Sequence, residues 1–165
     1  MKLTTRGRYA VTAMLDLALH DGAGPVALAD IARRNRISPA YLEQLLAGLR
    51  RQGLVESTRG PGGGYRLAQT ADRITVAHVI AAVNEAVDAT RCGGARNCDD
   101  GGRCLTHDLW EELTEHIQDF LSSVSLGDLA ERAQRRARGE YILGLLPPRS
   151  SMIREADQAV SLHAK

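Results

Sequence analysis

The segment from Cys92 to His107 limits how this chain can fold. It contains all three cysteines of the protein, and the stretch between the first and last cysteine has four glycines and only Ala95 as an apolar residue besides Cys98. Such a segment cannot fold around a core of its own, although glycine lets it curl tightly. Three thiolates and the His107 imidazole are enough ligands to close a metal site, whereas an odd number of cysteines cannot all form internal disulfides. A metal bound by these side chains would order the loop, and Cys92, Cys98, Cys104 and His107 are its candidate ligands.

The ligand spacing leaves the kind of metal open. Five residues separate each cysteine from the next, whereas structural zinc prefers ligand pairs about two to four residues apart. Three cysteines and one histidine fit a 2Fe–2S cluster, in which histidine occasionally replaces cysteine. Zinc is an alternative, and so is a redox switch in which pairs of cysteines form disulfides. Clustering of the cysteines argues against three unrelated thiols.

Composition excludes several classes of protein. The chain has 165 residues, of which 44% are hydrophobic, with one Trp and one Phe, so we expect an aliphatic core built by helix packing. No apolar run approaches the roughly 20 residues of a membrane span, and the N-terminus lacks an apolar stretch of signal-peptide type. We therefore expect a cytoplasmic protein with no membrane partner, in a compartment where thiols stay reduced.

The charge distribution suggests a polyanion partner for the first part of the chain. The net charge is only +1, but residues 1–66 contain ten Lys and Arg against five Asp and Glu, whereas residues 67–124 contain four against ten. A basic segment beside an acidic one favours a polyanion partner for the basic segment alone. Charge by itself does not separate this interpretation from a chance imbalance of solvated side chains.

Residues 10–51 have the arrangement of a helix-turn-helix. Apolar residues recur at helical spacing over 10–19, a short helix follows over 28–35, and Ser38 and Pro39 suit the N-cap and first position of a third helix. One face of the third helix is apolar. The opposite face holds Ala40, Gln44, Ala47 and Arg51, with Tyr41 and Glu43 at its sides. In a helix-turn-helix such a helix enters the major groove, although this segment alone also fits an ordinary amphipathic helix pair.

The residues after this helix predict a β-hairpin wing. Strand-like segments 54–59 and 64–67 are joined by a glycine-rich tip that begins with Gly60 and Pro61. Arg59 and Arg66 flank the tip, and arginine suits contact with phosphates or the minor groove. A P-loop is excluded because no Lys-Ser or Lys-Thr follows the glycines. Helix-turn-helix, hairpin and basic charge together predict double-stranded DNA as a partner.

A long helix is predicted to begin near Thr106, with His107 in its first turn. Leu109, Leu113, Ile117, Phe120 and Val124 recur on one side of it, which is typical of a seam for a partner helix. Burial within the monomer is the alternative. DNA-binding regulators commonly work as two-fold dimers, so we expect a homodimer. A short helix over 74–83 precedes the cysteine loop, and its His78 receives no role.

These expectations define the fold class and the organisation of the chain. The fold is mainly α: a winged helix-turn-helix with a small β-hairpin wing and a long C-terminal dimerisation helix. Residues 1–70 form the DNA-binding region, residues 71–138 contain the cluster-binding loop and the dimerisation helices, and residues 139–165, with Pro147 and Pro148, are expected to be a disordered tail.

Several segments resemble the IscR family of bacterial iron–sulfur cluster regulators. The similar segments are 7–16, 41–45, 59–65, 87–92, 104–107 and 125–129. The resemblance implies a winged-helix homodimer with one 2Fe–2S cluster per protomer, held by the three cysteines and His107 and supplied by the iron–sulfur assembly machinery. It also implies a feedback regulator that represses cluster-assembly genes when the cluster is present. Without the cluster, the family binds and can activate at a second class of DNA site.

The same resemblance assigns roles in DNA binding. Glu43 matches a glutamate that blocks the first class of site when the cluster is absent, because a carboxylate is repelled by phosphates and base acceptors unless it meets a donor such as cytosine N4. The other expected DNA contacts are Ser38, Tyr41, Gln44, Arg59, Gly60 and Pro61. Ala40 stands where the family often has a polar residue, which weakens the case for a direct contact there.

Four other functions compete with this one. An electron-transfer iron–sulfur protein would have no use for a recognition helix and a wing. A zinc-stabilised DNA regulator and a nitric-oxide sensor of similar build, with a larger cluster, both fit the DNA-binding features. An enzyme is the weakest hypothesis, because no nucleophile–base pair or carboxylate dyad stands out.

Overall fold

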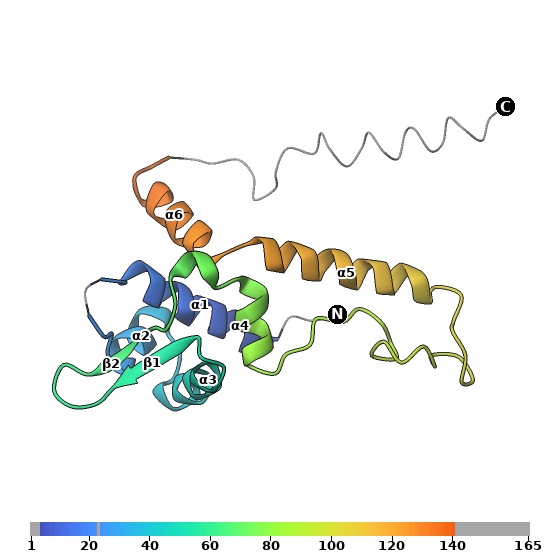
Figure 1. Cartoon of the computed structure of the whole chain (residues 1–165), viewed down its shortest axis with the longest axis horizontal. Helices are drawn as coiled ribbons and strands as arrows, with labels where there is room; N and C mark the ends of the chain where they lie inside the picture. The colour runs from blue at the N-terminus through green and yellow to red at the C-terminus, as the bar shows by residue number, and fades with distance from the viewer. Residues whose placement is uncertain (1–3, 23, 141–165) are drawn as a thin grey trace. The chain divides into compact units, whose positions relative to one another are not determined.

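The computed structural model describes residues 4–22 and 24–140 (Figure 1). The helices and strands, in chain order, are α1 Thr5–Leu19, α2 Leu28–Asn35, α3 Pro39–Arg51, β1 Val55–Thr58, β2 Gly64–Leu67, the short 3-10 helix η1 Ala71–Arg73, α4 Val76–Ala82, α5 His107–Ser123 and α6 Leu126–Ala137. Residues 1–133 form one compact unit, and α6 continues into a second unit that begins at Gln134. Most of the tail predicted over 139–165 lies outside the described residues.

The predicted winged helix-turn-helix and the mainly α fold are confirmed. α3 begins where the Ser38-Pro39 pair indicated, and the Ser38 hydroxyl accepts a hydrogen bond from the Tyr41 backbone N–H at 3.4 Å. β1 and β2 pair in an antiparallel hairpin, with Val55 opposite Leu67 and Thr58 opposite Gly64. The predicted turn at 60–63 therefore joins two real strands and forms the tip of the wing.

A third chain segment pairs with the wing on its β2 side. Val26 and Tyr65 exchange both backbone hydrogen bonds at 2.8 Å. A side chain at Gly64 would place its Cβ only 2.2 Å from the Val26 carbonyl oxygen, so glycine is required for this close approach. The pairing holds the wing against the segment that leads into α2.

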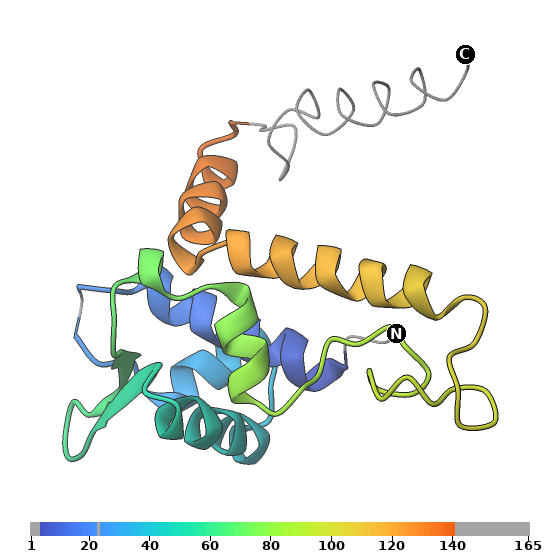
Figure 2. The ribbon, with the colours of Figure 1, turned by 45° about the vertical axis from the view of Figure 1, so that its right-hand side comes forward.

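One hydrophobic core joins the winged helix to the residues that follow it. Ala13 and Met14 of α1 and Leu46 of α3 are buried together with Val79 of α4 and Leu126 of α6. α1 and α4 lie side by side in both views of the ribbon (Figure 2). The segment before the cysteine loop is therefore packed directly onto the DNA-binding region. None of the helices within residues 4–22 and 24–140 is long and apolar enough to cross a membrane.

α5 leaves most of its apolar side exposed. His107 is the only buried residue of this 17-residue helix, whereas Leu109 is 58% and Trp110 41% exposed. The seam predicted from the sequence is wrong at its last position, because Val124 lies beyond the helix end and is buried against Val76 and Ile80. α5 thus has an apolar side that its own chain does not cover in the described residues.

A buried carboxylate ties α1 to α2. Asp16 is 7% exposed and accepts hydrogen bonds from Arg34 Nε at 2.9 Å and Nη2 at 2.5 Å, and from Asn35 Nδ2 at 2.9 Å. Burial raises the pKa of Asp16, but the hydrogen bonds from Arg34 and Asn35 outweigh it and hold the pKa below its ordinary value of 3.8. This contact fixes the first two helices of the helix-turn-helix relative to each other.

We expect Asp16→Asn to lower the free energy of unfolding by about 2 kcal/mol at neutral pH, because it removes charge-assisted hydrogen bonds. The pKa of Asp16 is depressed in the folded state, so its contribution is present above the unfolded pKa and is lost as pH falls through the folded pKa. Urea unfolding at neutral pH and at about pH 3 measures this, and the difference between variant and wild type should shrink in acid.

Asp21→Asn is the matched control, because it makes the same chemical change at an exposed position just past the end of α1. It should leave stability nearly unchanged. A difference between Asp16→Asn and wild type that stays constant from neutral pH to about pH 3 would contradict the role of the Asp16 charge.

Candidate metal centre and DNA interface

His107 is held at the start of α5 with its ring turned toward the cysteine loop. Its side chain is almost fully buried, and its backbone N–H donates to the Cys104 carbonyl oxygen at 3.0 Å. Nδ1 lies 3.7 Å from Cys92 Sγ and 3.5 Å from Cys98 Sγ. Nε2, also buried, has no hydrogen-bond partner among the described residues. The imidazole therefore presents one ring nitrogen to two thiols.

Thr106 occupies the N-cap position predicted for it, but its side chain does not cap the helix. Its Oγ1 instead accepts a hydrogen bond from Trp110 Nε1 at 3.2 Å and lies 3.8 Å from Cys104 Sγ. The hydroxyl thus contacts the third cysteine and the Trp110 indole, and it does not cap a backbone N–H of α5.

The cysteine loop curls tightly, as its glycines indicated. Gly93, Gly94 and Gly101 have positive φ angles of 63°, 80° and 86°. Arg96 also has a positive φ, of 58°, which is uncommon for a residue with a Cβ. The backbone N–H of Cys104 donates to Cys98 Sγ at 3.2 Å. These turns bring the cysteine side chains back toward the start of α5.

The residues present fit a metal centre. One ligand atom each from Cys92, Cys98 and His107 lies within 4.8 Å of the others. Cys104 stands beside this group through its contact with Cys98. A cavity of about 520 Å³ is bordered by Cys98, Cys104, His107, Trp110 and the segment 88–91. Thiolates and imidazole are ligands for both iron–sulfur clusters and zinc, so the donor set suits either.

The three thiols have different pKa values because their surroundings differ. Burial raises the pKa of Cys92, but the backbone N–H groups of Arg96 and Asn97 and the Thr90 hydroxyl lower it below the ordinary value. For Cys104, a hydrogen bond with the Cys98 side chain lowers the pKa. The Cys104 N–H favours the Cys98 thiolate, but the Cys104 thiol and burial outweigh it and raise the pKa of Cys98. The surroundings of Cys92 and Cys104 thus lower the pKa of each thiol and ease formation of the thiolate, the form that binds metals.

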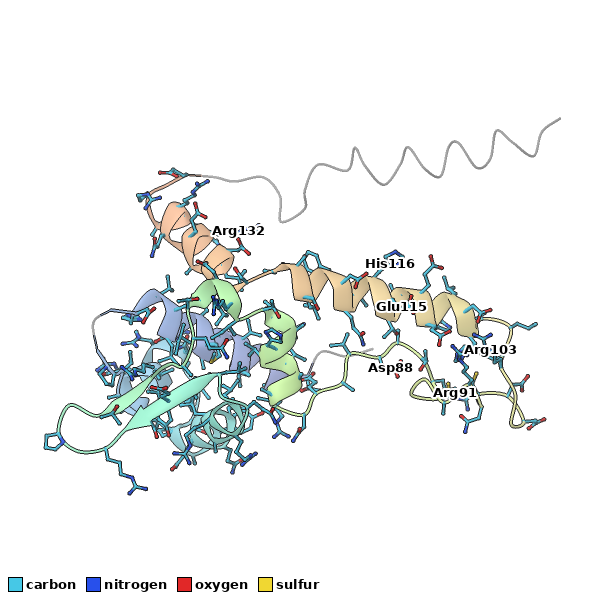
Figure 3. All side chains as sticks on the ribbon, in the orientation of Figure 1. Asp88, Arg91, Arg103, Glu115, His116 and Arg132 are labelled. Carbon is cyan, nitrogen blue, oxygen red and sulfur yellow. The ribbon has the colours of Figure 1, made fainter. Side chains whose placement is uncertain are left out.

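Polar residues that the sequence analysis gave no site role surround the loop. Glu111 forms ion pairs with Arg96 and Arg103 of the loop, each at 3.1 Å, and lies 3.8 Å from His107 Nε2. Figure 3 shows Arg103 beside the start of α5. Glu111 stands four residues after His107, so the i,i+4 spacing was a usable signal. The sequence alone does not show that Arg96 and Arg103, among the charged residues of the loop, are the ones that pair with Glu111.

The segment before Cys92 is attached to α5 by hydrogen bonds. The Ala89 backbone N–H donates to Thr114 Oγ1 at 2.9 Å, and Gln118 Nε2 donates to the Val87 carbonyl oxygen at 3.3 Å. Further back, the Glu85 carboxylate accepts hydrogen bonds from Thr4 and from the Gly7 backbone N–H at 2.6 Å. Glu85 therefore satisfies backbone donors at the start of α1.

The expected DNA contacts of α3 lie on its exposed side, with one exception. Ser38, Glu43 and Gln44 are exposed, whereas Tyr41 is half-buried and packs edge-on against Tyr9 with ring centroids 6.1 Å apart. The opposite side of the helix is buried in the core, as predicted. Tyr41 therefore has a packing role that the sequence analysis did not assign.

The two wing arginines have different surroundings. Arg66 forms an ion pair with Glu56 across the hairpin at 2.8 Å. Arg59, Gly60 and Pro61 are exposed, and within the described chain Arg59 has no hydrogen bond or ion pair. Arg50 of α3 donates to Ser57 Oγ of β1 at 3.1 Å, which connects the helix to the wing. Both ribbon views show α3 and the hairpin along the same edge of the unit (Figures 1 and 2).

A winged helix-turn-helix beside a thiol–imidazole group defines a DNA-binding regulator with a candidate metal site. Comparison with known families agrees: the Rrf2 model, described as an iron-dependent transcriptional regulator, matches residues 3–132. The chain belongs to the Rrf2 family. It is thus a DNA-binding transcriptional regulator and not an enzyme.

Within this family, the chain is similar to proteins named IscR. The HTH-type transcriptional regulator IscR of Xenorhabdus nematophila is 60% identical over 134 residues, which are 81% of this chain and 82% of that protein. IscR of Vibrio campbellii is 60% identical over 129 residues, 78% of this chain and 77% of that protein. The resemblance found in the sequence segments is therefore confirmed across most of the chain.

Two solved structures have the same fold. The structure of T. potens IscR has a TM-score of 0.69 and 39% identity, covering 87% of this chain and 94% of that one. CymR, the global cysteine regulator of B. subtilis, has a TM-score of 0.70 and 35% identity, covering 80% and 98%. The fold is thus shared by IscR and by a cysteine regulator, so the fold alone does not set the signal that this chain detects.

Proposed function

We propose that this protein is an iron–sulfur-cluster-responsive transcription regulator. Holding a 2Fe–2S cluster, it represses the genes for iron–sulfur cluster assembly; without the cluster, it binds a different class of DNA site and can activate there. The observation that supports this most is the buried His107 ring, which faces the Cys92 and Cys98 thiols from the first turn of α5. The IscR relatives support the same proposal.

Cys92, Cys98, Cys104 and His107 are the proposed ligands. A bound 2Fe–2S cluster would supply a group that is sensitive to iron, oxidants and nitric oxide. The ligands come from a loop without an apolar core and from the start of a helix, so closing the site constrains the loop relative to α5. Thr114 and Gln118 of α5 form hydrogen bonds with the segment that leads into the loop. A rearrangement of the ligands would therefore act on a segment that is already attached to α5.

That segment also contacts the DNA-binding region. Glu85 lies seven residues before Cys92 and binds the start of α1, and α4, directly before it, packs on α1. We infer that the order of the cysteine loop influences the helix-turn-helix through this connection. In this division of roles, residues 1–70 bind DNA and residues 71–138 hold the cluster and dimerise, although both contribute to one core.

The proposed working form is a homodimer joined along α5. Leu109, Trp110, Leu113 and Phe120 are exposed on this helix, and a helix needs to bury its apolar side to be stable in water. Pairing of two chains would also present two recognition helices to the two half-sites of a promoter. The proposed location is the cytoplasm, where a bacterial regulator meets promoter DNA and the iron–sulfur assembly machinery that supplies its cluster.

The metal content tests the proposal. Anaerobically purified protein should contain iron and acid-labile sulfide in equal amounts and show the visible absorption of a 2Fe–2S cluster, and Cys92→Ala should lose both because one thiolate ligand is gone. Elemental analysis with a visible spectrum measures this. A colourless protein with stoichiometric zinc would instead establish the zinc-stabilised alternative, and a larger cluster would favour the nitric-oxide sensor.

Glu43 is proposed to block the cluster-dependent DNA site in the cluster-free protein. We expect Glu43→Ala to raise the affinity of cluster-free protein for that site by on the order of 10-fold, because it removes a carboxylate that faces base acceptors and phosphates. A binding titration at fixed salt measures it. Glu112→Ala, which removes an equal charge from an exposed position of α5, should leave the affinity unchanged. Equal affinities for Glu43→Ala and wild type would refute the role of Glu43.

Arg59 is proposed to contact DNA from the wing together with Gly60 and Pro61, while Ser38, Tyr41 and Gln44 contact it from α3. We expect Arg59→Ala to weaken binding to both classes of site and to reduce the slope of log affinity against log salt by about 1. Arg66→Ala is the control on the same hairpin, because Arg66 is already paired with Glu56. A larger loss of salt dependence in Arg66→Ala than in Arg59→Ala would reverse this assignment.

A further inference from the structure

Three donors near the proposed metal ligands converge on one carboxylate of α5. Arg96 Nη2 lies 3.1 Å from Glu111 Oε1, and Arg103 Nη2 lies 3.1 Å from Glu111 Oε2. Arg96 stands between the first two cysteines and Arg103 directly precedes the third, so each span of the loop has one arginine bound to the same side chain. Glu111 therefore connects both spans to α5.

The third donor is the histidine itself. If Nδ1 of His107 binds metal, the proton of a neutral ring resides on Nε2, because only one ring nitrogen is then protonated. A metal-binding histidine usually donates this second N–H to a carboxylate, carbonyl or water, which fixes the ring orientation. Nε2 is buried without a hydrogen-bond partner in the described chain, and Glu111 Oε1 lies 3.8 Å from it. This distance is longer than a hydrogen bond, so the Glu111 carboxylate has to move slightly closer to Nε2 to accept its proton.

We propose that Glu111 is a positioning residue of the metal centre, which orients the His107 ring through Nε2 and holds the two loop arginines in place. The inference rests on the proposed function, because it requires His107 to be a ligand. Exposed ion pairs contribute little to stability individually, and Arg96 and Arg103 are about half exposed. The effect of Glu111 should therefore fall on the metal centre and not on the fold.

Two variants separate the contributions of Glu111. Glu111→Ala removes the acceptor for His107 and both ion pairs, whereas Glu111→Gln keeps an oxygen acceptor but removes the charge. We expect Glu111→Ala to lose its cluster on the order of 10-fold faster than wild type, with Glu111→Gln between them. Both should shift the reduction potential upward, because loss of a nearby negative charge favours the reduced, more negative cluster.

The experiment uses full-length protein carrying its cluster. Decay of the visible absorption in the presence of an iron chelator gives the rate of cluster loss, and a redox titration followed by the same absorption gives the potential. Glu112→Ala is the matched control, because it removes an equal charge from the next residue of α5, which is exposed and whose side chain forms no hydrogen bond or ion pair in the described part of the chain. It should match wild type in rate and shift the potential less than either Glu111 variant.

The cluster-free variants show whether the effect is specific to the metal centre. Cluster-free Glu111→Ala should melt at the wild-type temperature and bind the cluster-independent DNA site with wild-type affinity. If Glu111→Ala does not fold, the rate of cluster loss and the reduction potential of Glu111→Gln decide whether Glu111 has this positioning role. A wild-type rate and potential in the variants would overturn the role of Glu111 while leaving the proposed function intact. Wild-type protein that takes up no cluster would instead overturn the proposed function itself.

Discussion

The loop from Cys92 to Cys104 depends on contacts outside itself, because its glycines and polar residues cannot bury enough apolar surface to order it. Its neighbours provide those contacts: His107 at the start of α5 faces two of the thiols, and Glu111 one turn later binds two of its arginines. Because the loop has no apolar core, any ligand of its cysteines would add to a small set of polar contacts that hold it. A densely packed loop would keep its conformation with or without a ligand.

The connection from this loop to the DNA-binding region is made of short, specific contacts. Glu85 binds the start of α1, and Val79 and Ala82 of α4 lie in the same core as the buried leucines of α3. Asp16 then fixes α1 to α2 through Arg34. Each of these contacts joins consecutive parts of one packed unit, so a change at the cysteines has a continuous physical route to the recognition helix.

The wing and α5 show how one fold can serve regulators with different signals. The hairpin is fixed by Gly64 against Val26 and by Arg50 against Ser57, and none of these residues belongs to the metal centre. The proposed metal ligands are confined to the loop and the first residue of α5. The structure of a cysteine regulator has a similar fold, so the fold alone does not determine which signal a regulator of this shape detects.

Local sequence determined the helices, the wing and the candidate ligands. Ser38 and Pro39 set the start of α3, the leucine pattern set its buried side, and the glycines set the hairpin tip, because these features act through neighbouring residues. Cysteines are few and clustered, so they could be selected without a fold. The charged residues that surround the candidate site could not be selected in this way, because the loop contains several of them. Only the structure shows that Arg96 and Arg103 both form ion pairs with Glu111.

The other differences between the sequence-based expectations and the structure also come from contacts between residues that are distant in the sequence. Tyr41 was expected at the side of the recognition helix as a DNA contact but packs on Tyr9, and Val124 was expected in the α5 seam but is buried beside Val76. In each pair the two residues are more than 30 positions apart in the sequence. The sequence by itself determined which elements form and which side chains can bind a metal, since periodicity, capping and ligand chemistry are local. Tertiary structure decided which distant side chains meet, because packing and ion pairing depend on how the helices fold back on one another.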